Sequence, residues 1–159
     1  MAIEKSIDPR AFSDFERAGW DDSIAGYENA FGSVTRQTVE ATLDAASVSS
    51  GMRVLDLCTG PGMLAQGALR RGAKAVGIDL SDKAVEVARE YVPGGHFQRG
   101  DAQDLPFAND SFDAVVCGFG IMHLPDPEIA LREMLRVARD SGRIAISVWD
   151  NSIPNTGFG

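Results

Sequence analysis

VLDLCTGPG, residues 54–62, is the stretch of this chain that decides its fold. Its first four residues extend an apolar run that begins at Met52 and predicts a short buried strand. Gly60 and Gly62 then break the strand, because glycine permits a tight turn and a close backbone approach that a Cβ atom would prevent. Since a predicted helix follows at once, the stretch indicates the first strand and turn of a βαβ unit.

The same alternation of helix and strand continues along the chain. From residue 34 onward, the predicted helices cover residues 34–48, 63–71, 82–92 and 127–139, and the predicted strands cover residues 52–57, 74–78, 96–99, 111–118 and 143–149. Continuous apolar strands separated by such helices are typical of a parallel sheet covered on both faces. With right-handed crossovers, we expect an α/β fold with a doubly wound, Rossmann-like sheet of five strands.

Local signals predict where several of these elements begin and end. Ser81 and Asp126 are expected to be helix N-caps, and Gly72 is expected to be a C-cap glycine. Residues 140–142 are predicted to form a turn between the last helix and the last strand. That last helix is expected to bury Ile129, Met134, Leu135 and Ala138.

Composition and charge argue against several classes of protein. The 159 residues, 44% hydrophobic and 24% charged, are expected to form one globular domain. A net charge of −8 argues against a nucleic-acid substrate, because binding phosphates needs positive charge. We see neither a membrane span nor a secretory signal in the sequence. Cys58 and Cys117 are expected to be buried free thiols rather than metal ligands, which favours a cytoplasmic protein without a metal site.

The acidic residue within the deciding stretch, Asp56, bears on the identity of the ligand. Gly60, Gly62 and Ala65 fit the dinucleotide pattern G-x-G-x-x-G/A, so a nicotinamide-dependent oxidoreductase is one interpretation. A carboxylate there would repel the phosphates of a dinucleotide, but it suits S-adenosylmethionine, which carries an ammonium and a sulfonium group and no phosphate. A plain capping aspartate at a strand–turn–helix corner is the third interpretation.

Further polar residues follow the next predicted strands. Asp79 comes about 20 residues after Gly60, the spacing at which an acid accepts hydrogen bonds from a ribose. Asp79 would equally suit the positive end of the helix that begins near Ser81. Asp101 and Ala102 offer a carboxylate and a backbone N–H to an adenine edge, or form an ordinary polar loop.

In their order along the chain, VLDLCTGPG, GIDLS, GDAQDLPF, FDAVVCGFGIMHLPDP and LREMLRVARDSGRIAISVW resemble a known family. Residues 20–149 are similar to class I S-adenosylmethionine-dependent methyltransferases of the small-molecule type related to ubiquinone/menaquinone methyltransferases. The resemblance implies S-adenosyl-L-methionine as cofactor, S-adenosyl-L-homocysteine as product, and a small-molecule acceptor.

The resemblance also implies a role for each site residue. Asp56 and the backbone of Cys58, Thr59 and Gly60 would hold the methionine moiety. Asp79 would hold the ribose and Leu80 would pack on the adenine, whose edge Asp101 and Ala102 would contact. Gly118 and Phe119 would pass near the centre of the cofactor. Tyr27, in a lid region at residues 20–31, would cover the reactive methyl group.

The chain departs from the family pattern in two places. Cys58 stands where the family usually has glycine, and we expect the cysteine to be tolerated with a negative φ angle. The family sheet continues with an antiparallel pair of strands beyond the fifth, which this sequence lacks. We therefore divide the domain into a lid region (1–33), a core (34–150) and a short, apparently truncated tail (151–159).

Without that pair, the predicted fifth strand would have an open edge. Ile144, Ile146 and Val148 lie along it, and Arg143 is its one charged residue. We expect the edge to be covered by the N-terminal segment, by the tail, or by the same strand of a second molecule in a homodimer.

The sequence does not identify a catalytic residue. His123 follows the fourth strand and is either a general base, since imidazole suits that task, or a residue that packs and hydrogen-bonds within its loop. Methyl transfer by direct displacement depends largely on positioning and does not require a base. A methyltransferase is therefore the function we expect, with a non-catalytic S-adenosylmethionine-binding module as an alternative.

Overall fold

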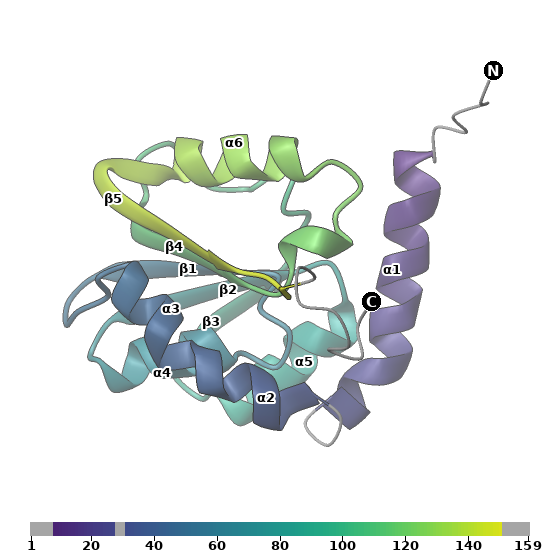
Figure 1. Ribbon diagram of the computed structural model, residues 1–159, viewed down its shortest axis with the longest axis horizontal. Helices are drawn as coiled ribbons and strands as arrows, with labels where there is room; N and C mark the ends of the chain where they lie inside the picture. The colour runs from purple at the N-terminus through teal and green to yellow at the C-terminus, as the bar shows by residue number, and fades with distance from the viewer. Residues whose placement is uncertain (1–7, 28–30, 151–159) are drawn as a thin grey trace.

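A single sheet of five parallel strands organises the chain (Figure 1). The computed structural model describes residues 8–27 and 31–150. The strand order is β3-β2-β1-β4-β5, which places the deciding stretch at the centre of the sheet. The strands are β1 Arg53–Leu57, β2 Lys74–Asp79, β3 His96–Arg99, β4 Phe112–Gly118 and β5 Ala138–Ser147. The predicted doubly wound α/β fold is confirmed.

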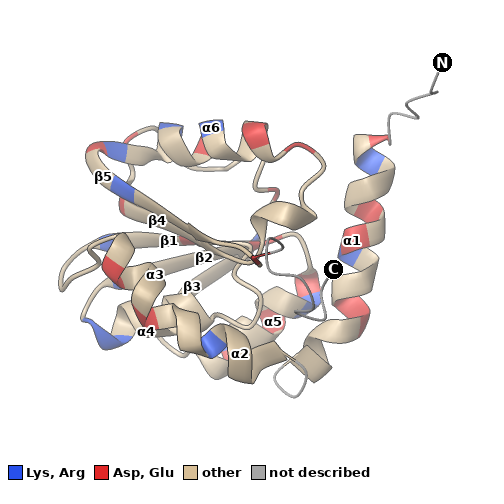
Figure 2. Cartoon of the chain, in the orientation of Figure 1, with Lys and Arg blue, Asp and Glu red and all other residues tan. Residues whose placement is uncertain are grey.

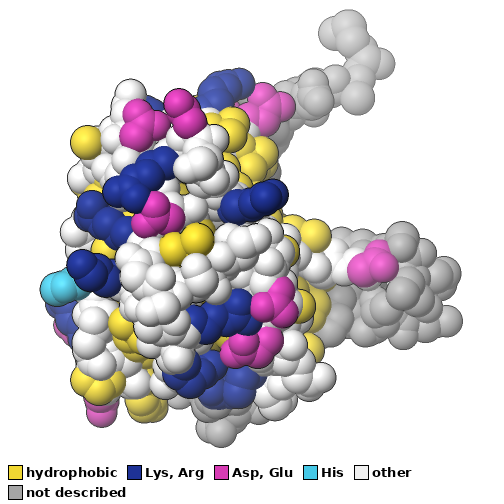
Figure 3. All heavy atoms as spheres, turned by 90° about the vertical axis from the view of Figure 1, so that its left-hand side faces the viewer, with side chains coloured by type: hydrophobic (Ala, Val, Ile, Leu, Met, Phe, Trp, Pro, Cys, Tyr) yellow, Lys and Arg dark blue, Asp and Glu magenta, His cyan; other side chains and the backbone are white. Residues whose placement is uncertain are grey.

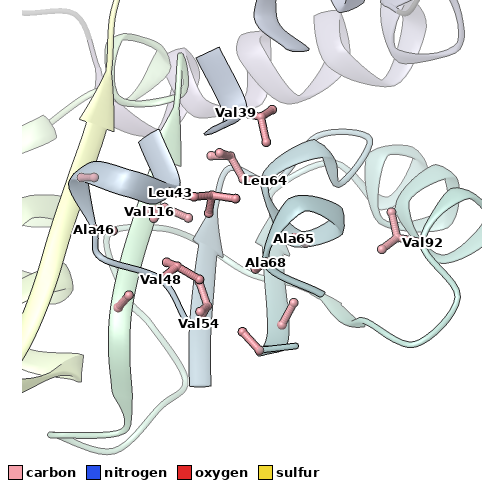
Figure 4. Packing of buried hydrophobic residues seen from close by; sticks show 14 of the residues in the cluster. Val39, Leu43, Ala46, Val48, Val54, Leu64, Ala65, Ala68, Val92 and Val116 are labelled. Atoms are coloured by element: carbon pink, nitrogen blue, oxygen red, sulfur yellow. The ribbon is translucent and has the colours of Figure 1, made fainter. Parts of the chain in front are cut away.

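Helices cover both faces of this sheet and create two cores. The helices α3 Val39–Ala45, α4 Met63–Arg70 and α5 Asp82–Tyr91 contribute to one core, and α6 Pro127–Val137 contributes to the other. Figure 4 shows Leu43 of α3 beside Leu64 of α4 and Val116 of β4 in the first core. Because β1 is covered on both faces, Val54, Leu55 and Leu57 are all fully buried.

The predicted helix ends are confirmed. The Ser81 hydroxyl accepts a hydrogen bond from the Ala84 N–H at 3.0 Å and caps α5. Asp126 accepts bonds from the first two free N–H groups of α6, at 3.1 and 3.2 Å. Gly72 has a φ of +78° just beyond α4, as a C-cap glycine requires.

The predicted helix at 34–48 is divided into short pieces. Helix α2 (Ser33–Thr35) is followed by the 3₁₀ turn η3 (Arg36–Thr38) and then by α3. Threonine hydroxyls in this region bond to backbone carbonyls one turn earlier, including Thr38 to Thr35 at 2.8 Å and Thr42 to Thr38 at 2.9 Å. Such bonds compete with regular helical geometry, which a periodicity argument does not consider.

Two expectations about α6 and β5 are wrong in detail. Ile129 and Leu135 are 38% and 67% exposed, because the buried stripe of α6 is formed by Ala130, Met134 and Val137. The predicted turn at 140–142 is instead part of a bulge in β5. Pairing with β4 jumps from Ala138 to Arg143, so residues 139–142 loop out within the strand.

The N-terminal helix stands apart from the sheet and crosses the carboxyl ends of its strands (Figure 1). This helix, α1 (Pro9–Ser23), is followed by the 3₁₀ turn η1 (Ile24–Gly26), and both pack against α5. Within residues 8–27 and 31–150, we find no helix long and apolar enough to cross a membrane.

The open edge predicted for the fifth strand is present in the described part of the chain. There, β5 pairs with β4 on one side and with no strand on the other. Helix α1 does not cover this edge, because it packs on α5 at the opposite side of the sheet order. The tail, residues 151–159, lies outside the described residues.

Leu55 of β1 and Val115 of β4 test the assignment of the central strands. Both side chains are fully buried in the core beneath α6. We expect Leu55→Ala and Val115→Ala each to lower the free energy of unfolding by about 2–5 kcal/mol, the valine toward the lower figure. Leu135→Ala on the exposed face of α6 is the control, and urea titration is the measurement. An unchanged midpoint for either core variant would contradict the assignment.

Candidate functional site

A cavity of about 290 Å³ lies at the carboxyl ends of β1, β2 and β4, with α1 and η1 on its opposite side. This is where a doubly wound sheet binds its ligands. All the predicted cofactor residues except Asp101 and Ala102 line the cavity: Tyr27, Asp56, Cys58, Thr59, Gly60, Asp79, Leu80, Gly118 and Phe119. The strand ends therefore bring together residues that are far apart in the sequence.

Asp56 lies next to the last residue of β1, beneath the cavity. The residue is only 2% exposed, and its Oδ2 atom accepts hydrogen bonds from the Thr59 hydroxyl at 2.7 Å and the Ala65 N–H at 3.0 Å. Burial raises the pKa of the Asp56 carboxyl to about 7, although both hydrogen bonds act in the other direction. Asp56 therefore caps the first turn of α4 through Ala65, and its carboxyl also lines the cavity.

The loop after Asp56 has an unusual backbone. Cys58 has a φ of +54°, so the expectation of a negative angle at this cysteine is wrong. Glycine adopts this left-handed conformation without a steric cost, which is the physical reason for glycine at such a position. A hydrogen bond with the Cys117 thiol, together with burial, raises the pKa of the Cys58 thiol well above its usual range. Both cysteines are free thiols, as expected.

Asp79 joins the glycine loop to the start of α5. Its Oδ2 atom accepts the Gly60 N–H and its Oδ1 atom accepts the Ser81 N–H, each at 2.9 Å. Burial raises the pKa of the Asp79 carboxyl, against the effect of these bonds. The side chain supports the helix start, as one interpretation held, while it also lines the cavity. Asp56 and Asp79 thus make this wall of the cavity acidic.

Asp101 and Ala102 line a smaller adjoining pocket of about 20 Å³ instead of the main cavity. Asp79, Leu80 and His123 line both spaces, so the two are neighbours. The Asp101 carboxylate accepts the Gln103 N–H at 2.8 Å, as in an ordinary polar turn.

Beyond β4, the chain turns sharply into the cavity wall. Phe119 has a φ of +56°, and its ring stacks on Trp149 with the ring centroids 4.2 Å apart. The Phe119 N–H donates to the Ser147 carbonyl at 2.9 Å, which holds the turn against the end of β5. A non-glycine residue at positive φ persists only where its surroundings fix it, and such residues concentrate at functional sites.

Sequence reasoning missed the contribution of α1. Glu16, Arg17 and Trp20 of this helix line the cavity, together with Ile24 of η1. The spacing of Glu16, Trp20 and Ile24 by four residues was a usable signal, because such residues share one face of a helix.

His123 contacts α1 rather than bonding within its own loop. Its Nδ1 atom lies 3.0 Å from Oε2 of Glu16, and its ring meets the Trp20 ring edge-on at 5.2 Å between centroids. These two contacts with α1 account for the position of the His123 ring, and the side chain makes them in place of a hydrogen bond within its own loop. In the described ranges, we find no cluster of His, Cys, Asp and Glu side chains that could hold a metal ion.

Comparisons with known proteins agree on one family. The sequence profile of the Methyltransferase domain matches residues 55–146. Over 119 residues, 75% of this chain, it is 36% identical to the demethylmenaquinone methyltransferase of Paenarthrobacter aurescens (strain TC1), 47% of which is covered. It is 40% identical over 109 residues, 67% of the chain, to that of Clavibacter sepedonicus, 44% of which is covered. The chain spans about half the length of the curated relatives it matches.

Solved structures give the same result for the fold. A chain in the complex between the Haloferax volcanii Trm112 methyltransferase activator and a methyltransferase has a TM-score of 0.72 and 30% identity. The match covers 81% of this chain and 59% of that chain. The YcgJ protein of Bacillus subtilis has a TM-score of 0.64 and 32% identity, with 69% of this chain and 49% of that chain covered.

The raised pKa of Asp56 predicts how the stability of the ligand-free protein depends on pH. A carboxyl with a pKa near 7 when folded and near 3.9 when unfolded stabilises the fold fully below pH 4, and this contribution is lost as pH rises through 7. As pH rises from 4 to 8, we expect the free energy of unfolding of Asp56→Asn to increase by on the order of 4 kcal/mol relative to that of the wild type. Urea unfolding across this range measures the difference.

The control for this prediction is Glu90→Gln, which removes one exposed carboxyl from α5. The difference between Asp56→Asn and wild type should change with pH far more than the difference between this control and wild type. Equal pH dependence of the two variants would show that the burial argument for Asp56 fails.

Proposed function

Because the chain belongs to the class I S-adenosylmethionine-dependent methyltransferase family, we propose that it transfers a methyl group from S-adenosyl-L-methionine to a small-molecule acceptor. The observation that carries this proposal is the pair of acidic side chains on either side of the glycine loop, the buried Asp56 and the partly buried Asp79. A cationic ligand without phosphates fits such a wall, whereas a dinucleotide does not.

The hydrogen bonds of the loop support the same choice. The Gly60 N–H, which a phosphate-binding loop would direct at its ligand, donates to Asp79 instead. A pyrophosphate would have to displace this bond and lie beside two acids. The nicotinamide-dependent oxidoreductase is therefore not favoured, and the relatives reported above are not named as oxidoreductases.

We assign the cofactor contacts along the cavity as follows. Asp56 and the loop at Cys58, Thr59 and Gly60 would hold the methionine moiety, Asp79 the ribose, and Leu80 the adenine face. Asp101 and Ala102, in the adjoining pocket, would meet the adenine edge. Gly118 and Phe119 would lie beside the centre of the cofactor, with Tyr27 over the methyl group.

The aromatic side chains that line the cavity suit an apolar acceptor. These side chains come from three parts of the chain: Trp20, Tyr27, Phe31, Phe119 and Trp149. A flat, apolar molecule would pack well on these rings. The names of the two demethylmenaquinone methyltransferases are consistent with such an acceptor.

The chemistry asked of the protein is mainly positioning. The bound cofactor supplies an electrophilic methyl group on a sulfonium, which the acceptor displaces directly. The aromatic walls and α1 orient the acceptor and exclude water from the reacting atoms. The alternative is a non-catalytic binding module. A turnover assay with candidate acceptors would distinguish it from an active methyltransferase.

We also propose that the protein works in the cytoplasm and does not bind nucleic acid. The two free thiols beside the cavity suit a reducing compartment. Basic side chains are visible on the face opposite the cavity (Figure 3), but Arg70 at the end of α4 and Arg71 just after it are paired with acids. Arg71, for example, pairs with Glu40 at 2.5 Å and with Asp44 at 2.8 Å.

Calorimetry with S-adenosylhomocysteine tests the proposed cofactor. We expect the protein to bind it, and we expect Asp79→Ala to weaken binding by about 1.5–3 kcal/mol while the circular dichroism spectrum is kept. Asp82→Ala, which removes an exposed acid three residues further on, is the matched control. If folded wild-type protein gave no heat of binding, the proposal would be overturned. If Asp79→Ala bound with the wild-type affinity, the role of Asp79 would be limited to supporting the loop and the start of α5.

The open edge of β5 leads us to propose a homodimer in which this edge pairs with its copy. The Ser147 carbonyl accepts the Phe119 N–H, so the backbone groups of Ser147, the last residue of β5, face β4 and those of the next residue face the open edge. The side chain of that residue, Val148, is 55% exposed. Analytical ultracentrifugation should show self-association that Val148→Pro abolishes and Val148→Thr retains. A wild-type chain that stays monomeric as its concentration rises would contradict this.

A further inference from the structure

Helix α1 closes the cavity on the side opposite the sheet, and it is attached to the rest of the protein at two polar points. Near its C-terminal end, Asp21 accepts a hydrogen bond from the Ser81 hydroxyl at 2.6 Å. At the middle of the helix, Glu16 meets His123 at 3.0 Å, across 107 residues of sequence. Glu16 lies on the face of α1 that lines the cavity, and Asp21 lies more than a helical turn further along the helix.

These two attachments differ in how firmly they are supported. Ser81 is 1% exposed and also caps α5, and Ile24, just after α1, is 4% exposed. The C-terminal end of α1 is therefore anchored in the core. At the Glu16–His123 contact, the Glu16 side chain is 20% exposed and the His123 side chain is 36% exposed. Phe15, next to Glu16, is 74% exposed.

The like charges of Asp21 and Asp79 oppose the closed position of α1, although Arg17 of the same helix lines the cavity and pairs with Asp21 at 3.5 Å. The helix carries several acidic residues (Figure 2), and it faces the acidic wall formed by Asp56 and Asp79. Burial raises the pKa of the Asp79 carboxyl, and the negative charge of Asp21 adds to this effect. The Glu16–His123 contact joins the two sides of the cavity against this repulsion.

We propose that the Glu16–His123 pair is a clasp that holds α1 closed over the cavity, with the anchored end at Asp21 and Ile24 as the pivot. Since a ligand that spans the strand ends lies beneath α1, opening the clasp sets the rate at which the bound cofactor leaves. The second statement rests on the proposed function. Both residues act as positioning residues, because they hold Trp20 against the cavity and perform no chemical step.

Trp20 provides a direct signal of this closure. Its ring contacts the His123 ring at 5.2 Å and the Tyr27 ring at 6.0 Å. Trp149→Phe removes the only other tryptophan and keeps an aromatic ring beside Phe119, so the fluorescence of this parent protein reports Trp20 alone. Quenching by acrylamide then measures how accessible the indole is.

In the ligand-free parent, Glu16→Leu should raise the acrylamide quenching constant of Trp20. This variant carries the test because it removes the Glu16–His123 contact without changing either ring of the Trp20–His123 pair. His96→Gln, at the exposed second histidine, should leave the quenching unchanged. Equal quenching in Glu16→Leu and its parent would overturn the clasp, whether or not the protein binds a cofactor.

A double-mutant cycle on the release of S-adenosylhomocysteine tests the kinetic part. Glu16→Leu and His123→Leu should each speed release about three- to tenfold, as expected for a partly exposed charged hydrogen bond. The double variant should be no faster than the faster single variant, because both changes remove one interaction. His123→Gln, which keeps a donor for Glu16, should restore part of the slow release that His123→Leu loses.

Two kinetic results would overturn the proposal: release rates of both single variants equal to the parent's, or effects that multiply in the double variant. Absence of any S-adenosylhomocysteine binding would instead contradict the proposed cofactor. The quenching of Trp20 in the ligand-free protein would still decide whether Glu16 holds α1 closed.

Discussion

The burial of the Asp56 carboxyl at the end of the central strand constrains the structure around it. A carboxyl at 2% exposure must be hydrogen-bonded, and Thr59 and Ala65 supply the donors. Those two bonds fix the curvature of the loop and the first turn of α4, and the loop in turn offers the Gly60 N–H to Asp79. The position of one side chain thus connects β1, β2 and α4 into one wall of the cavity.

The acidic side chains of this wall repel each other across the ligand side of the cavity. The buried Asp56 carboxyl and the partly buried Asp79 carboxyl lie near each other, and desolvation raises the pKa of both. A cationic ligand compensates such a wall, and without one the wall opposes the acidic helix α1 that covers it. The attachment of α1 through Asp21 and through Glu16 is therefore part of the same balance of charge.

Much of the fold and the site followed from local sequence signals. The strand around Leu55, the N-caps Ser81 and Asp126, and the acids at the strand ends were all predicted from residues close together in the chain. Conformations that are set by close packing were not predicted from the sequence. The left-handed angle of Cys58, which contacts Cys117, and the bulge in β5, where the pairing with β4 shifts, depend on tertiary neighbours that local patterns do not place. The buried face of α6 was misjudged for the same reason, since the sheet and not the hydrophobicity of Ile129 or Leu135 decided its rotation.

The sequence by itself determined the α/β class, the edge of the sheet where the site lies, and the acids that favour a cationic cofactor. It could do so because hydrophobic period, turn chemistry and capping act within a few residues. Only the tertiary structure decided that α1 forms the second wall and that Glu16 meets His123. Contacts between side chains 107 residues apart depend on how whole helices pack on the sheet, and no local signal in either segment encodes that distance.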